Sequence, residues 1–139
     1  MAAFNKFNSF VSDLAQKVHN LNSDTLKILL TNTAPVAGNT VKANLTEIAA
    51  GNGYTAGGSV AAFVSGNDTG GTYKLILSPV TFIATGGAIG PFEFAVLYNS
   101  TAASGNLIGW WDYGVPITVT NGNSFQVALD QTNGVFTLS

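Results

Sequence analysis

Apolar residues near the start of the chain recur at alternating spacings of three and four, which is the period of one helical face. They are Phe4, Phe7, Val11, Leu14, Val18 and Leu21. Asp13 and Lys17 stand four apart in the order that stabilises a helix, and Asn20 and Asn22 are residues that end helices. The pattern predicts an N-terminal α-helix over residues 1–22. A coiled-coil seam is the alternative, but the expected flanking charges are missing, so packing on the chain's own sheet is favoured.

The pattern then changes to short β-branched or aromatic runs bounded by Gly, Asn, Pro or Ser. These runs predict strands over residues 25–31, 59–64, 72–77, 81–84, 92–98, 107–113, 117–120, 124–130 and 135–138. Asn121-Gly122 is a strong hairpin signal between two of them, and Asn133-Gly134 joins the last two in a similar way. The runs predict a mainly β fold, an antiparallel β-sandwich that is jelly-roll-like.

Residues 32–58 lie between the helical and β patterns and show neither period. Loops longer than about 12–15 residues are uncommon in compact domains and are usually functional or flexible. This segment is therefore predicted to be an extended arm or loop of a single domain, residues 1–139.

Four glycines and a tyrosine cluster at the end of this arm, in the sequence "GNGYTAGG". Dinucleotide-binding loops and P-loops need a different glycine spacing and a following helix, and a P-loop also needs a lysine. The glycines are instead predicted to allow positive φ angles and close backbone contact, with the tyrosine as an aromatic anchor. The predicted protein-interface residues of this contact arm are Gly51, Gly53, Tyr54, Gly57 and Gly58.

Charge is scarce along the whole chain. Charged residues make up 9% of the sequence, against about 25% in an average soluble domain. Five dispersed lysines, no arginine and a net charge of −2 argue against nucleic acid as a partner. No run resembles a signal peptide or reaches the ~20 apolar residues of a membrane helix, so we expect a protein made in a cytoplasm without membrane association. A surface so poor in charge favours contact with other subunits, including a homo-oligomer.

Residues that could support catalysis are few. His19 is the only histidine, cysteine is absent, and no nucleophile motif of the G-x-S-x-G type occurs. His19 is interpreted as a surface or boundary residue of the helix. Glu93 and Asp112 fall on neighbouring predicted strands, where a glycosidase-like carboxylate pair is conceivable. We expect no enzymatic activity, no catalytic or metal site, no cofactor and no small-molecule substrate.

The sequence "GWWDYG" contains two adjacent tryptophans on a predicted strand, so their side chains should point to opposite faces. One ring belongs to the core, and the other is then an exposed aromatic group. Trp110 is the candidate interface residue. An exposed tryptophan could alternatively form a carbohydrate-binding platform, and the sequence leaves both uses open.

Three stretches together resemble a family of small virion structural proteins of tailed bacteriophages: "AAFNKFNSFVSDLAQKVHNLNSDTLKILLTNTAPV", "LTEIAAGNGYTAGG" and "LIGWWDYG". The resemblance implies a capsid cement or decoration protein that binds and stabilises the shell of the major capsid protein. It implies a location on the virion surface after synthesis in the host cytoplasm. A neck or tail component, or a carbohydrate-binding module on the virion, are the alternatives.

Overall fold

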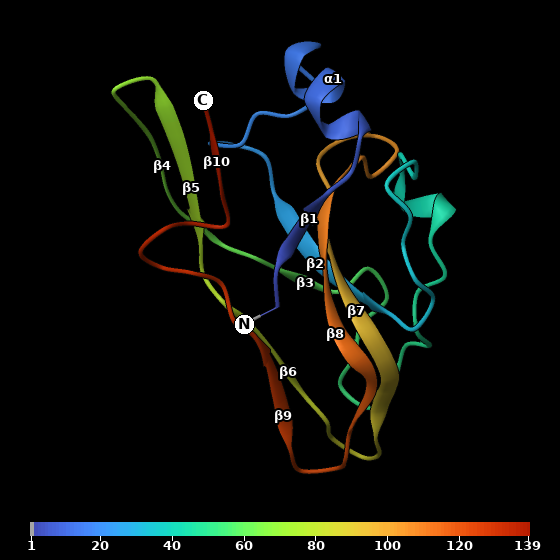
Figure 1. The fold of residues 1–139 in the computed structure, drawn as a ribbon. Helices are drawn as coiled ribbons and strands as arrows, with labels where there is room; N and C mark the ends of the chain where they lie inside the picture. Colours follow the sequence, from blue (N-terminus) through green and yellow to red (C-terminus); the bar gives the residue numbers. More distant parts are fainter. Residues whose placement is uncertain (1) are drawn as a thin grey trace.

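A five-stranded antiparallel sheet is built around long apolar strands, in a computed structural model that describes residues 2–139. Its strand order is β1-β8-β7-β2-β3 (Figure 1). The strands are β1 (Phe4–Lys6), β8 (Leu107–Val119), β7 (Ile89–Asn99), β2 (Leu26–Thr31) and β3 (Ser59–Val60). The β7–β2 pair runs in continuous register from Leu26 opposite Asn99 to Thr31 opposite Phe94, and these residues form the centre of the sheet.

Two smaller sheets form the second layer of the molecule. The first has the order β10-β5-β4 and the second pairs β6 with β9. Their bounds are β4 (Phe63–Thr69), β5 (Thr72–Leu77), β6 (Val80–Ile83), β9 (Ser124–Val127) and β10 (Phe136–Leu138). The main apolar core lies between the layers and joins residues such as Ile28 and Leu97 to residues such as Leu75 and Phe82. The predicted mainly β, antiparallel fold is confirmed, whereas the jelly-roll connectivity is not confirmed.

The five-stranded sheet is buried on both faces. Successive β2 residues alternate between two apolar clusters, with Ile28 and Leu30 in the main core and Leu29 in a second cluster. That second cluster consists of Phe7, Leu29, Val96, Tyr98 and Leu107. A strand that is buried on both faces has a nearly continuous apolar sequence. The β2 sequence "LKILLT" fits this description apart from Lys27 and Thr31.

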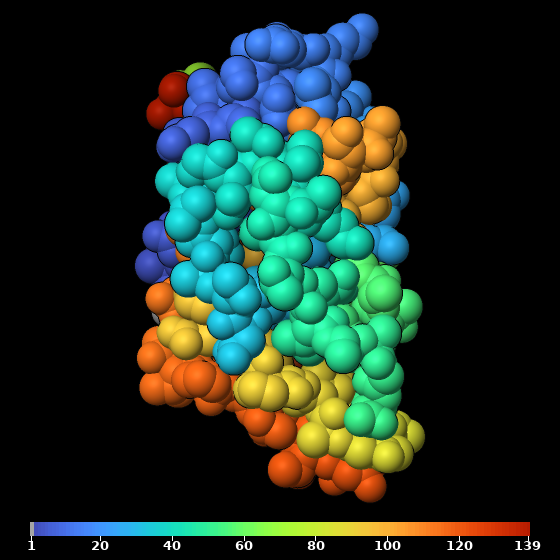
Figure 2. Space-filling view, turned by 90° about the vertical axis from the view of Figure 1, so that its right-hand side faces the viewer, coloured from blue at the N-terminus to red at the C-terminus, as the bar shows by residue number. Residues whose placement is uncertain are grey.

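Residues 32–58 lie over this second face and along the edge of β2, where Ile48 and Tyr54 pack in the main core. Figure 2 shows them in cyan to green, spread over the molecule between the blue N-terminal region and the yellow and orange strands. They contain one short 3-10 helix, η1 (Lys42–Asn44), and Leu45 packs against the second cluster. The described residues between β2 and β3 contain no strand, and we call residues 32–58, which lie on the sheet, the cover.

The helix prediction was too long. The single α-helix of the described residues is α1 (Ser9–Ala15), and residues 4–6 form strand β1 on the edge of β8. The Phe4 ring packs edge-on against Trp111 at 5.4 Å, so tertiary packing outweighs the helical period there. The helix ends in a Schellman motif, in which Val18 N–H donates to Asp13 O and Lys17 adopts a φ of 68°. This end had no glycine to signal it.

Both predicted turns exist, but neither joins paired strands. Asn121-Gly122 follows β8, which belongs to the large sheet, and precedes β9, which pairs with β6. Gly122 N–H donates to Ala84 O, so the turn is attached to the end of β6. Likewise, Asn133-Gly134 precedes β10, which pairs with β5. The hairpin expectation was wrong because the strand after each turn pairs with another strand of the second layer. β9 pairs with β6, and β10 pairs with β5.

We predict that Gly109→Ala destabilises the fold by about 1–3 kcal/mol, a typical cost of overpacking. A Cβ at this position would overlap the Phe4 ring and lie 2.6 Å from the carbonyl oxygen of Asn5, forcing β1 away from β8. Urea denaturation monitored by tryptophan fluorescence measures the change. Gly38→Ala is the matched control, because a Cβ there meets no atom of the described residues within 4 Å. Equal stability of the two variants would contradict this account of β1.

Candidate functional site

The Glu47 carboxylate fastens the glycine-rich segment to the sheet. Glu47 forms an isolated bridge with Thr31 at the end of β2. Its Oε1 atom accepts hydrogen bonds from the Tyr54 hydroxyl at 2.6 Å and from Gly57 N–H. The Tyr54 hydroxyl in turn accepts a hydrogen bond from Leu30 N–H at 3.0 Å. Hydrogen bonds to a charged carboxylate are stronger than neutral ones, and here they connect both ends of residues 47–57 to β2.

Tyr54 is consequently a core residue, and its predicted role as an aromatic anchor of a protein interface is wrong. Its side chain is 2% exposed and its ring lies 5.6 Å from the Phe82 ring. Burial, followed by the hydrogen bond to Glu47, raises the pKa of Tyr54 far above its ordinary value. Removing residues 47–58 would therefore open the core, and these residues cannot be deleted as an independent contact arm.

The glycines serve close packing of the backbone. Gly57 and Gly58 are buried, and a Cβ on Gly58 would overlap the carbonyl oxygen of Ile28. Gly51 and Gly53 are exposed, yet a Cβ on Gly53 would overlap the carbonyl oxygen of Ile83. All four have positive φ angles, as predicted. Of the predicted interface residues in this segment, only Gly51 and Gly53 lie at the surface.

The two tryptophans point to opposite faces, as predicted. Trp111 is buried in the main core, and Trp110 is half-buried on the second face. The Trp110 ring packs on Phe7 with a centroid distance of 4.5 Å. Because Phe7 contacts this ring, Trp110 offers a partner only part of its surface.

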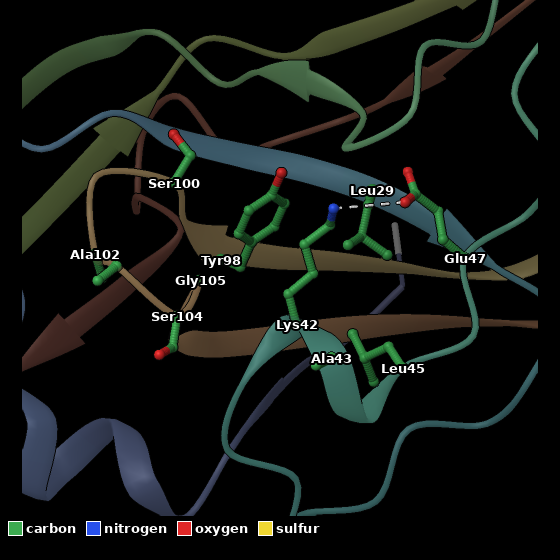
Figure 3. A pocket seen from close by; sticks show the side chains of 11 residues that line it. Leu29, Lys42, Ala43, Leu45, Glu47, Tyr98, Ser100, Ala102, Ser104 and Gly105 are labelled. Atoms are coloured by element: carbon green, nitrogen blue, oxygen red, sulfur yellow. Dashed lines mark ion pairs between the residues drawn. The ribbon is translucent and has the colours of Figure 1, made fainter.

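A surface pocket of about 540 Å³ lies where the cover meets the loop after β7 (Figure 3). Leu29, Leu45 and Tyr98 contribute apolar surface, and residues 100 and 102–105 form the rim. Lys42 Nζ lies 3.7 Å from Glu47 Oε2 and 5.8 Å from the centre of the Tyr98 ring. The Tyr98 hydroxyl donates to Gly57 O at 2.6 Å. Lys42 and Glu47 have opposite charges and form an ion pair, so the pocket has no net charge. It offers a ligand apolar contact area beside this ion pair.

Glu93 and Asp112 are brought together, as their positions on neighbouring strands suggested. Desolvation and then the hydrogen bond and charge of Asp112 raise the pKa of Glu93. Asp112 is exposed, and its Oδ1 atom accepts the N–H of Gly114 at 2.7 Å. The pair therefore lies on open strand surface, where Asp112 stabilises a bulge of β8.

His19 is buried, so its interpretation as a surface or boundary residue was wrong. Its side chain lies against Phe10 and Asn99. His19 is the sole histidine of the chain. The helical period placed it beside the apolar stripe, but α1 ends before it and the chain turns inward.

Exposed apolar side chains are frequent on the strands between residues 59 and 83, a feature that the sequence pattern did not predict. Four of the large ones lie on β3, β4 and β6; β3 contacts β6 and precedes β4 along the chain. We call them the β3–β4–β6 edge; they are Val60, Phe63, Val64 and Ile83, with exposed fractions of 42–58%. Residues 59–67 contain no charged residue, and this is the feature of the sequence that could have indicated an apolar surface here.

Comparison of the chain with protein-family models, with curated proteins and with solved structures gave no match. Within residues 2–139, no three His, Asp or Glu side chains gather as metal ligands would. The described part of the chain also has no helix with the length and apolar character needed to cross a membrane.

We predict that Tyr54→Phe destabilises the protein by about 1–3 kcal/mol, because Leu30 N–H and Glu47 each lose a buried hydrogen-bond partner. Thermal and chemical denaturation measure the loss. Tyr113→Phe is the matched control, since its ring packs on Phe125 at 5.1 Å but its hydroxyl makes no hydrogen bond within residues 2–139. If both variants lose the same stability, the Glu47–Tyr54 network is not what fastens the cover.

Proposed function

We propose that this chain is a structural protein of the virion of a tailed bacteriophage, and that it acts as a capsid cement protein on the shell of the major capsid protein. The observation that supports it most is the β3–β4–β6 edge, where half-exposed apolar side chains stand on a chain with 9% charged residues. The sequence resemblance to small virion structural proteins supplies the bacteriophage context. The partners are the major capsid protein and further copies of this chain.

The chemistry of the edge suits contact with protein. Water-exposed apolar area contributes about 25 cal/mol per Å² when a partner buries it, and charged groups, which are costly to desolvate, are absent from residues 59–67. Strand edges also present unpaired backbone groups that another chain can pair with. A stable interface needs about 800 Å² from each partner, so a cement protein would combine this edge with contacts from neighbouring copies.

A firmly fastened cover also suits a binding role. Because Glu47, Tyr54 and Tyr98 hold residues 47–57 on the sheet, the molecule presents a preorganised surface. Binding then costs little conformational entropy. Trp110 is half-buried and packs on Phe7, so it offers a sugar less ring surface than a free aromatic platform would, which favours this structural role over a carbohydrate-binding module.

The copy number of the chain per virion tests the proposal. We expect a ratio to the major capsid protein near one, or a simple fraction such as one half or one third, in quantitative mass spectrometry of purified particles. A dozen copies or fewer would assign the chain to the neck or tail instead. Absence from the particle would overturn the virion role altogether.

We further predict that Val64→Asp weakens binding to capsid shells that lack this protein by roughly tenfold or more, because it places a charge in an apolar contact. Val11→Asp on α1 is the matched control, since Val11 and Val64 have similar exposed fractions of 54% and 51%. Sedimentation of shells with bound protein measures both. Unchanged binding of Val64→Asp would remove the β3–β4–β6 edge from the interface, even if the protein is found in virions.

A further inference from the structure

His19 lies in a closed environment between the end of α1 and the start of β2. Its side chain is inaccessible to solvent. The Nδ1 atom lies 3.0 Å from Asn99 Nδ2, at the end of β7. Within residues 2–139 the Nε2 atom has no hydrogen-bond partner, and Asp13 Oδ2 lies 4.0 Å from it. One nitrogen of this imidazole is therefore paired and the other points toward a carboxylate beyond hydrogen-bond distance.

The hydrogen bonds of Asn99 determine which nitrogen of His19 carries the proton. Asn99 Oδ1 accepts the N–H groups of Thr101 at 2.9 Å and Ala102 at 3.2 Å. The amide nitrogen must then face Asp24 Oδ2, at 2.7 Å, and His19 Nδ1. An amide nitrogen only donates, so His19 Nδ1 is an acceptor and the neutral ring carries its proton on Nε2.

A second proton on His19 conflicts with this arrangement. Protonated Nδ1 would be a donor facing the donor of Asn99. Turning the Asn99 amide over would restore that contact but would strip Thr101 and Ala102 of their acceptor. It would also place the acceptor Oδ1 against Asp24 Oδ2, where the amide nitrogen now donates. Protonation therefore costs at least one buried contact, whichever way Asn99 responds.

Charged and titratable groups around the ring act in opposite directions. Burial lowers the pKa of His19, and the charges of Asp13 on α1 and Asp24 before β2 raise it, with burial the largest effect. Lys17 and Tyr73 line the hollow that His19 also borders, and β10 contributes only Leu138 there. On β7 the facing group is the uncharged Asn99.

Asn99 begins a loop that joins three parts of the fold. Thr25 N–H, before β2, donates to Thr101 Oγ1 at 2.8 Å, and Asn106 donates to Asp13 Oδ2 at 3.0 Å. Lys42 N–H, in the cover, donates to Gly105 O at 3.0 Å. Figure 3 shows Ser100, Ala102, Ser104 and Gly105 of this loop along the pocket that holds Lys42. Release of the loop would loosen the pocket rim and the attached part of the cover together.

We propose that His19 and Asn99 form an acid-sensitive latch: protonation of His19 displaces the Asn99 side chain and frees residues 99–106, which hold the pocket rim and the cover. The latch is closed at neutral pH. It is a property of the folded chain and does not depend on the proposed virion role.

The direction of the pH effect follows from burial. Because the folded state has the lower His19 pKa, the unfolded state binds the proton first as the pH falls below about 6.5. Stability contributed by neutral His19 is therefore complete above about pH 6.5 and declines below it. In the folded protein the latch opens only when the pH falls to the pKa of the buried His19 ring, which is lower than that of a free histidine.

NMR titration of the full chain from pH 8 to pH 4.5 tests the latch, and a single histidine makes the imidazole signals unambiguous. We expect the Nε2–H tautomer at neutral pH. The backbone amides of Thr101 and Ala102 and the side-chain amide of Asn99 should shift with the His19 midpoint. Exchange of amide hydrogens in residues 99–106 should rise roughly tenfold per pH unit relative to intrinsic exchange as the protonated fraction grows. An Nδ1–H tautomer, or a loop that ignores the His19 midpoint, would overturn the proposal.

His19→Asn is the matched variant, because its side-chain oxygen can accept from Asn99 and cannot be protonated in this range. We expect residues 99–106 of this variant to show no transition between pH 8 and pH 5. An unchanged transition would contradict a histidine latch. If the variant does not fold, the titration of the natural chain decides the question by itself.

Discussion

Burial of the five-stranded sheet on both faces is the constraint on which the rest of this structure depends. β2 and β7 are apolar on both sides, so each face needs its own cover to remove that surface from water. The β4-β5-β10 and β6-β9 layer covers one face, and residues 32–58 cover the other. A long segment without regular strands is stable in this position because its apolar contacts and hydrogen bonds replace those of a second sheet.

Polar contacts hold this cover at two places. Glu47 joins the glycine-rich segment to β2. The loop after Asn99 accepts the Lys42 N–H of the cover, and it also contacts α1 and the residue before β2. Buried polar networks of this kind stabilise one arrangement when every member is paired, and they become costly when one member changes its charge. His19 is the member of the second network that gains a charge on protonation, and burial lowers its pKa.

Scarce charge connects the fold to the proposed role. Few charged groups leave the surface without the usual barrier to association, and the β3–β4–β6 edge adds apolar side chains at open strand edges. Because the cover is fastened internally, contact with a partner falls to this edge and to the remaining surface, and the glycine-rich segment acts as part of the scaffold. Function then depends on surface shape and on the number of neighbouring copies, as it does in structural assemblies.

Local sequence was sufficient wherever a local rule governs the backbone. The β-rich class, the bounds of β5, the positive φ angles of the glycines and the opposite faces of Trp110 and Trp111 could all be predicted, because alternation and turn chemistry act over a few residues. Pairing partners depend on contacts between distant residues. The Phe4 ring over Gly109 makes residues 4–6 a strand, and the two-layer arrangement separates β8 from β9. The burial of Tyr54 and His19 was likewise decided by tertiary structure, because their partners Leu30, Glu47 and Asn99 come from other elements of the chain.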